Sequence, residues 1–230
     1  MRRRICRHFC QTVCAAVVLM LWTTACTTED YESGNGEYSY LRADFAEVHT
    51  VGSKKVANAR TDEGDSLVLQ PPLDCSWTTT PDSTYRALLY YSREPGKKLE
   101  VKGFSAMQVL VLHTKVPKEG TEVRTDPLTL ESAWLSPNGK YLNLGLYVKI
   151  GKGDAKDAYQ TLGMVRDTVI TTDDGTKVHH LRLMHNQNGM PEYYSSRIYT
   201  STPLAPFGKG DVLRVEVNTY EGKVVRMFTL

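Results

Sequence analysis

The sequence predicts an all-β protein, with an N-terminal OB-type barrel followed by a C-terminal Ig-like β-sandwich. Two observations support this fold class. From Tyr38 onward, apolar residues recur with a period of two rather than 3.6. Gly, Pro, Asp and Asn also interrupt the chain at short intervals, as expected for turns between short strands.

The first 25 residues have the three parts of a secretory signal peptide. A basic head leads into an apolar stretch from Thr12 to Trp22, and small residues then precede Cys26. The apolar stretch is shorter than the roughly 20 residues of a membrane-spanning helix. We therefore expect residues 1–25 to be removed on export and to take no part in the fold.

Cys26 is the candidate lipidation site. A lipoprotein signal needs a cysteine at the cut, because its thiolate accepts the lipid, and small residues before it, here Thr24 and Ala25. Thr23 stands where Leu is common, so an ordinary signal with a free cysteine nearby is the alternative. The polar residues 26–37 are expected to form a flexible tether between the lipid and the fold.

The residues after Cys26 also bear on location. Glu29 and Asp30 resemble the acidic signal that sends lipoproteins of Bacteroidota to the outer face of the outer membrane. We therefore expect a lipid-anchored protein of the outer membrane, and we favour the cell surface over the periplasmic face.

Charge and cysteine content argue against two classes of protein. Four of the 28 Lys and Arg residues lie in the signal, whereas all 26 Asp and Glu residues follow it, so the mature chain carries 24 minus 26, or −2. This balance gives no support for a nucleic-acid partner. Only Cys75 remains as a thiol once Cys26 is lipidated, so a disulfide framework is excluded and an apolar core must stabilise the chain.

Residues 38–116 are expected to form the barrel domain. Val56–Arg60 and Ser66–Leu69 flank a turn-like segment, Thr61–Asp65, and should form a hairpin. Further strands are expected at Tyr85–Tyr91 and Leu99–Leu112. Five strands in this length match a small OB-type barrel, although strand spacing alone leaves a sandwich open.

Residues 117–230 are expected to form the sandwich domain, because the segment from Pro117 to Pro127 is polar and resembles a boundary. Two hairpins are predicted here. One turns at Asp173–Gly175, and the other joins Leu213–Thr219 to Lys223–Phe228. About seven short strands with such turns are typical of an Ig-like sandwich.

A set of short strings, in this order, resembles the NigD-like lipoproteins of Bacteroidota from about Tyr38 to the C-terminus. The strings are Asn58–Gly64, Asp82–Arg86, Asp126–Pro127, Ser132–Leu135, Tyr141–Leu144, Leu183–Asn186 and Ser201–Leu204. The resemblance implies the same division into an OB-type barrel and a β-sandwich. The family name comes from a proposed bacteriocin-immunity role, and the resemblance transfers no functional residues.

Clustered histidines are the first candidates for metal binding. In an extended strand His179 and His185 point to one face, some 20 Å apart, and His180 points to the other. Residues so placed cannot share one metal, so we expect surface or structural histidines and no metal site. The carboxylates of Asp62, Glu63 and Asp65 lack the EF-hand spacing and are explained by the turn.

Nucleophilic catalysis has no candidate motif, because no Gly-x-Ser-x-Gly string is present. Cys75 lies between Asp74 and Ser76, where negative charge disfavours the thiolate, so we expect an unreactive, partly buried thiol. The sequence therefore predicts no catalytic residue and no cofactor.

Four aromatic residues are candidates for stacking on sugars or nucleotides: Trp77, Trp134, Tyr193 and Tyr194. Trp134 is favoured as sandwich core, whereas Trp77 lies in a Pro-bounded loop, whose position leaves an exposed ring open. Taken together, the sequence favours a non-enzymatic envelope lipoprotein that binds a protein or glycan through its loops or its OB face. An immunity-type lipoprotein is the alternative, and an undetected hydrolase is the second.

Overall fold

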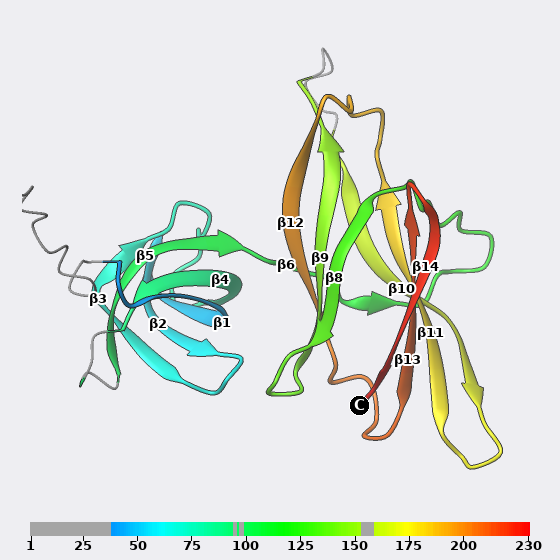
Figure 1. The fold of residues 1–230 in the computed structure, drawn as a ribbon, viewed down its shortest axis with the longest axis horizontal. Coiled ribbons are helices and arrows are strands. Elements are labelled where there is room, and N and C mark those ends of the chain that lie inside the picture. The colour runs from blue at the N-terminus through cyan, green and yellow to red at the C-terminus, as the bar shows by residue number, and fades with distance from the viewer. Residues whose placement is uncertain (1–37, 94–95, 97–98, 153–158) are drawn as a thin grey trace, which may run out of the picture. The chain divides into compact units, whose positions relative to one another are not determined.

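The computed structural model describes residues 38–230 except 94–95, 97–98 and 153–158, and all their regular structure is β-strand (Figure 1). The predicted signal peptide, the tether and Cys26 lie outside the described residues. Within the described part, no helix is long and apolar enough to cross a membrane. The all-β prediction is confirmed.

The first five strands close into a barrel. They are β1 (Leu41–Gly52), β2 (Lys55–Thr61), β3 (Ser66–Asp74), β4 (Thr84–Ser92) and β5 (Glu100–Gln108). Their order around the barrel is β1-β2-β3-β5-β4, and β4 pairs back with β1. Neighbouring strands are antiparallel except for the short parallel pairing of β3 with β5. Such a five-stranded closed barrel is the predicted OB-type architecture.

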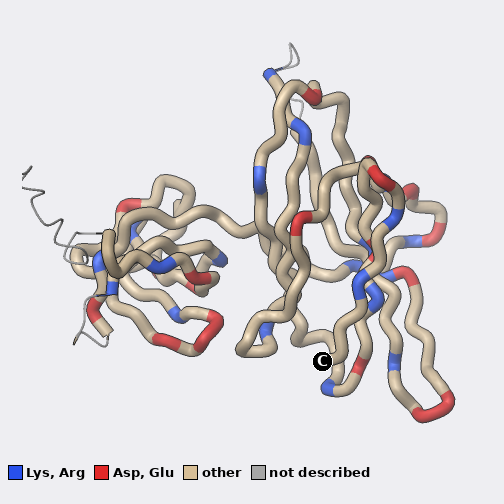
Figure 2. The backbone as a smooth tube through the Cα atoms, viewed as in Figure 1, with Lys and Arg blue, Asp and Glu red and all other residues tan. Residues whose placement is uncertain are grey.

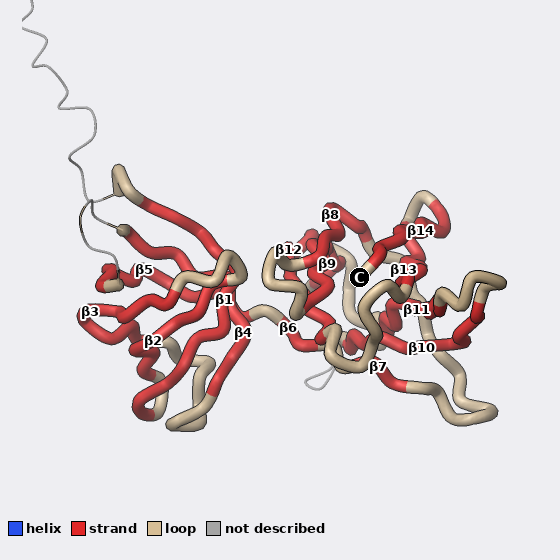
Figure 3. Tube along the Cα trace, turned by 90° about the horizontal axis from the view of Figure 1, so that it is seen from below, coloured by secondary structure: helices blue, strands red, loops and turns tan. Residues whose placement is uncertain are grey.

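The remaining strands form two sheets of a sandwich, coloured as strands in Figure 3. One sheet has the order β14-β13-β11-β10-β7 and the other the order β6-β12-β9-β8. The strands are β6 (Leu110–Val111), β7 (Thr114–Lys115), β8 (Thr129–Leu135), β9 (Tyr141–Ile150), β10 (Thr161–Thr171), β11 (Lys177–Asn186), β12 (Tyr194–Pro203), β13 (Val212–Thr219) and β14 (Gly222–Thr229). Both predicted hairpins are present, as β10–β11 and β13–β14.

Each part has its own apolar core. The barrel core contains Val48, Leu69 and Leu89, which are fully buried. The sandwich core is built around the alternating leucines of β9 and the facing residues of β11 and β13. A third, smaller cluster joins Leu88, Val109 and Tyr199, and therefore contains residues from both the barrel and the sandwich.

Strand pairing changes from barrel to sandwich before the predicted boundary. The expected strand Leu99–Leu112 ends at Gln108, and β6 and β7 then pair in parallel with β12 and β10 of the sandwich. A short run that leaves one sheet can satisfy its backbone groups by joining another sheet, which is consistent with the early change. The described residues from Tyr40 to Leu230 form one compact unit. A boundary at residues 117–127 stays a prediction.

Candidate functional site

The histidines of β11 serve the sandwich rather than a shared site. His179 is buried, and its Nε2 lies 2.8 Å from a carboxylate oxygen of Asp211. His185 is buried further along the strand, where its Nδ1 lies 2.9 Å from the carbonyl oxygen of Asp126. His180 faces the opposite side, as the alternation predicts. No group of three potential metal-binding side chains occurs in the part of the chain that the structure describes.

Cys75 is a buried thiol in the barrel core. Burial raises its pKa above the ordinary value, even though contacts with Thr78 act in the opposite direction. The group therefore stays protonated at neutral pH, and a thiol in that state is a poor nucleophile.

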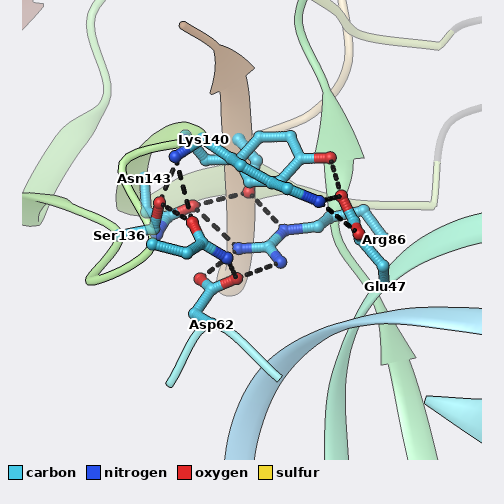
Figure 4. Close-up of polar contacts among 9 residues, drawn as sticks. Glu47, Asp62, Arg86, Ser136, Lys140 and Asn143 are labelled. Carbon is cyan, nitrogen blue, oxygen red and sulfur yellow. Dashed lines mark hydrogen bonds and ion pairs between the residues drawn. The ribbon is translucent and has the colours of Figure 1, made fainter. Parts of the chain in front are cut away.

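The turn after β2 holds the site that the sequence did not reveal. Asp62 was explained by turn composition, yet it is buried and faces Arg86 of β4 (Figure 4). Arg86 Nη1 donates to Asp62 Oδ1 at 2.7 Å, and Nη2 donates to Oδ2 at 2.5 Å. The side chains are 1% and 8% exposed. This two-point geometry is the strongest form of an Arg–carboxylate pair.

Arg86 also reaches the sandwich. Its Nε donates to Ser201 Oγ on β12 at 3.1 Å, and the Ser201 hydroxyl donates to Asn143 Oδ1 on β9 at 2.6 Å. Arg86 Nη2 contacts the same Asn143 oxygen at 3.4 Å. The guanidinium lies 4.2 Å from the ring centroid of Tyr141, within the range of a cation–π contact. One barrel residue thus binds three residues of two sandwich strands.

The β8–β9 turn completes the contact on the other side of Asp62. Asn138 Nδ2 donates to Asp62 Oδ1 at 3.2 Å, while the Ser136 hydroxyl donates to Asn138 Oδ1 at 2.7 Å. The Tyr141 amide donates to Ser136 Oγ at 2.9 Å, which fixes the turn to the start of β9. Every charged atom of the central pair is therefore matched by a protein partner.

A second ion pair lies beside the first. Lys140 Nζ donates to Glu47 Oε2 on β1 at 2.8 Å, and the Tyr141 hydroxyl donates to Oε1 at 2.8 Å. Partial burial alone would raise the Glu47 pKa, but hydrogen bonds from Lys140 and Tyr141 hold that pKa below its ordinary value. Burial and the Glu47 carboxylate raise the pKa of Tyr141 to about 12, so its hydroxyl remains a donor.

Aromatic rings pack around this polar network. Phe45 of β1 makes edge-on contacts with Trp134 at 5.2 Å and with Tyr199 at 5.3 Å, measured between ring centroids. Trp134 therefore belongs to the cluster that joins barrel and sandwich, and its assignment to the sandwich core was wrong. An alternating pattern cannot tell a sandwich interior from the opposite face of the same sheet when both faces are covered.

Of the two possibilities for Trp77, the structure shows a ring packed against the barrel rather than an exposed one. Its indole nitrogen donates to the Ala106 carbonyl at 2.9 Å, and its ring packs edge-on against Tyr85 at 5.7 Å. The residue is half-buried, because the indole is large enough to reach back from its loop and cover the barrel core.

A groove of about 240 Å³ opens beside the network and is lined partly by Asp44, Phe45, Glu63 and Trp134. The Asp44 carboxylate accepts a hydrogen bond from the Tyr91 hydroxyl at 2.6 Å. Burial and this carboxylate raise the pKa of Tyr91 to about 12. Charged residues of both signs are interspersed over the described chain (Figure 2), whereas the charged residues that line the groove, Asp44, Asp62 and Glu63, are all acidic.

The signal that could have found the network was present in the sequence. Asp62, Arg86, Asn143 and Ser201 each lie in a different string of the family resemblance, and Trp134 lies in another. The strings come together in space, so their co-occurrence reflects one joint between barrel and sandwich rather than a catalytic motif.

Comparison with known proteins agrees with the fold. No protein-family model matches the chain, and no curated protein matches it. A NigD-like immunity protein from Bacteroides caccae is similar in structure, with a TM-score of 0.61, 20% identity, and coverage of 81% of this chain and 91% of that one. A protein from Parabacteroides distasonis, described as a candidate toxin-related protein, gives a TM-score of 0.59, 19% identity, and coverage of 82% and 92%.

A candidate lipoprotein from Bacteroides fragilis is also similar, with a TM-score of 0.55, 12% identity, and coverage of 82% of this chain and 96% of that one. At such identities the likeness concerns the fold. The resemblance inferred from the sequence is confirmed at that level: this chain has the fold of a NigD-like immunity protein.

Proposed function

We propose that this chain is a non-enzymatic binding protein of the cell envelope, anchored to the membrane by lipid on Cys26. The observation that carries the binding role is the complete pairing of the two buried charges at the centre of the polar network. Arg86 and Asp62 are buried and fully paired with each other and with protein partners, so they serve as structure. The network ties barrel to sandwich, and the loops of a β-scaffold held together by such contacts can serve recognition.

Three buried groups support the same proposal. Cys75 is buried with a raised pKa, and His179 and His185 are each occupied by a hydrogen-bond partner in the sandwich. Catalysis by a nucleophile requires an adjacent general base that is free to take its proton. These three groups are engaged elsewhere, which favours binding over hydrolysis.

The anchor is tested by metabolic labelling with a palmitate analogue in cells that express the full precursor. We expect label and membrane fractionation in the wild type, and loss of both in Cys26→Ala. Cys14→Ala is the matched control, because that cysteine lies within the signal and should not matter. Label that persists in Cys26→Ala would contradict the proposal.

Placement on the cell surface is part of the proposal and has its own test. Protease added to intact cells should remove the protein if it faces outward, while a periplasmic marker protein stays intact. Protection that disappears only after the outer membrane is opened would place the protein on the periplasmic face instead.

A second candidate function is protection against a toxin at the envelope. The similar structures described as an immunity protein and as toxin-related favour it. This role predicts that a toxin made by related cells kills a strain lacking this protein, and that re-expression restores survival. Equal killing of both strains would remove this candidate.

A further inference from the structure

Four exposed tyrosines lie in segments at the ends of the sandwich strands. Tyr193 is 75% exposed, Tyr159 66%, Tyr194 55% and Tyr220 44%. Monomeric proteins expose few large contiguous apolar patches, and those they do expose are often functional. The barrel–sandwich joint uses none of these rings.

The ring of Tyr193 packs against the backbone of Gly151. A Cβ atom built on Gly151, which follows β9, would lie 2.8 Å from Cδ2 of Tyr193 and 2.7 Å from Cβ of Pro191. The ring therefore rests against a position that only glycine leaves open, while most of the residue remains in solvent. The result is a supported ring with a free surface.

Tyr220, in the β13–β14 turn, lies close to the same strand ends. Its hydroxyl is 3.4 Å from Oε2 of Glu192, the residue before Tyr193, and Lys149 Nζ lies 6.0 Å from the centre of its ring. The Tyr220 ring thus lies beside one carboxylate and one ammonium group, and the residue that carries this carboxylate is followed directly by Tyr193. We call Lys149, Glu192, Tyr193 and Tyr220 the tyrosine platform.

The β11–β12 loop, which carries Glu192 and Tyr193, is held by hydrogen bonds to its neighbour. Gln187 Nε2 donates to the Lys149 carbonyl at 2.9 Å and to the Met190 carbonyl at 3.0 Å, so one amide ties the β11–β12 loop to the end of β9. A preorganised surface loses little conformational entropy on binding, which favours recognition of small ligands.

We propose that the tyrosine platform binds a neutral glycan. This inference rests on the binding role proposed above and names its site and ligand class. Exposed rings offer flat apolar surfaces to the C–H faces of sugars, and the adjacent carboxylate and ammonium groups can hydrogen-bond to hydroxyls. The charges of the Glu192 carboxylate and the Lys149 ammonium group sum to zero, so a ligand without net charge suits the platform.

The size and the charge of the platform favour a glycan over a protein partner or a nucleic acid. The two tyrosines of the platform, which are 75% and 44% exposed, together expose on the order of 240 Å², since one such side chain offers about 200 Å². A stable protein interface buries about 800 Å² on each partner. Nucleic acid would need several phosphate contacts from Lys and Arg, whereas the platform has one lysine and the mature chain carries 24 basic against 26 acidic residues.

The test uses the whole mature chain with Cys26→Ser, titrated by calorimetry with soluble chito-, malto-, xylo- and manno-oligosaccharides. We expect at least one series to bind, and Tyr193→Ala to weaken that binding by tenfold or more. Tyr193→Phe should retain affinity, because stacking does not require the hydroxyl. Tyr40→Ala, at a tyrosine near the start of the barrel that is 39% exposed, is the control and should bind as the wild type does.

Gly151→Ala should also weaken glycan binding, because the added Cβ would displace the Tyr193 ring without removing it. Circular dichroism of each variant shows that the fold is retained. The proposal is overturned if none of the four series binds, or if Tyr193→Ala and Tyr40→Ala bind alike. It is also overturned if a photo-cross-linking residue placed at position 193 captures a protein in intact cells. The Cys26 labelling result is independent of all these outcomes, so failure of the glycan proposal and failure of the anchor are distinguishable.

Discussion

Arg86 and Asp62 form a two-point ion pair that is almost completely removed from solvent, 24 positions apart in the sequence. Burying two charges costs several kcal/mol for each ion, and only good geometry with additional hydrogen bonds offsets that cost. Ser201 and Asn138 supply such bonds from the sandwich side. The pair therefore depends on the contact between barrel and sandwich, and that contact depends on the pair.

Breaking the pair on one side should be strongly destabilising. We expect Arg86→Met to lower the free energy of unfolding by about 3–5 kcal/mol, because it leaves the Asp62 carboxylate buried without its cation. Arg86→Lys should also destabilise, since an ammonium group cannot replace the two-point contact. Urea denaturation followed by tryptophan fluorescence measures both effects.

The double variant Arg86→Met/Asp62→Leu is the matched control, because it removes both charges together. We expect it to be more stable than the sum of the two single changes predicts, with a coupling energy of about 1–3 kcal/mol. Additive effects would show that the two residues do not depend on each other.

The local parts of the fold could be predicted from the sequence because turn chemistry and strand period are local properties. The β13–β14 hairpin turns at Gly222, whose φ of 112° suits glycine, and the β10–β11 hairpin turns at Gly175 with a φ of 84°. The residues that flank each turn then alternate between core and solvent. This alternation in the sequence predicts the two strands of each hairpin.

The joint between barrel and sandwich could not be predicted in the same way. Asp62 follows a strand and precedes Glu63 and Gly64, so its composition fits a solvated turn equally well. Asp62 is buried because Arg86 of β4, which is distant in the sequence, packs against its carboxylate in the fold. Asn143 alternates with leucines as a surface residue would, yet it is fully buried because residues from the barrel cover the outer face of β9.

Acid should weaken the second ion pair selectively. The lowered pKa of Glu47 means that its ionised form is favoured in the folded state relative to the ordinary value of 4.5. Its contribution to stability is therefore present above about pH 4.5 and is lost as pH falls through the lower folded-state pKa. We expect Glu47→Gln to lower the midpoint of thermal unfolding by up to ~3 °C at pH 7, about 1 kcal/mol for a partly exposed pair.

That difference between Glu47→Gln and the wild type should shrink as the pH falls from 4.5 through the lowered folded-state pKa of Glu47, because the wild-type side chain then becomes protonated too. Differential scanning calorimetry at several pH values provides the measurement. Glu63→Gln, at an exposed turn residue close by, should show a small and flat difference across the same range. A Glu47→Gln effect that grows toward acid pH would reverse the sign and refute the assignment.

Limited proteolysis tests the predicted boundary at residues 117–127. Lys118 to Glu122 are exposed and lie outside the strands, so we expect early cleavage there, after removal of the residues before Tyr38. The strands β6 and β7, on the N-terminal side of this cut, pair with β12 and β10. The two fragments should therefore separate on a denaturing gel but elute together on native size-exclusion chromatography.

Cleavage within Leu142–Val148 at the same early stage would contradict this prediction, since those residues pair on both sides within their sheet. Fragments that part under native conditions would show instead that residues 117–127 link two independent domains.

Folding should require neither a disulfide nor a metal. Cys75 is a free, buried thiol, and one cysteine cannot close an intramolecular bridge. His179 and His185 each have their own partners, and two apolar cores provide the stabilisation.

We therefore expect the midpoint of thermal unfolding of a soluble fragment that begins at Glu37 to be unchanged by dithiothreitol or by EDTA. It should also be independent of protein concentration, because a thiol that is 4% exposed cannot link two folded copies. A fall of more than ~5 °C in EDTA, roughly 1–2 kcal/mol for a protein of this size, would reveal a bound metal that contributes to the fold.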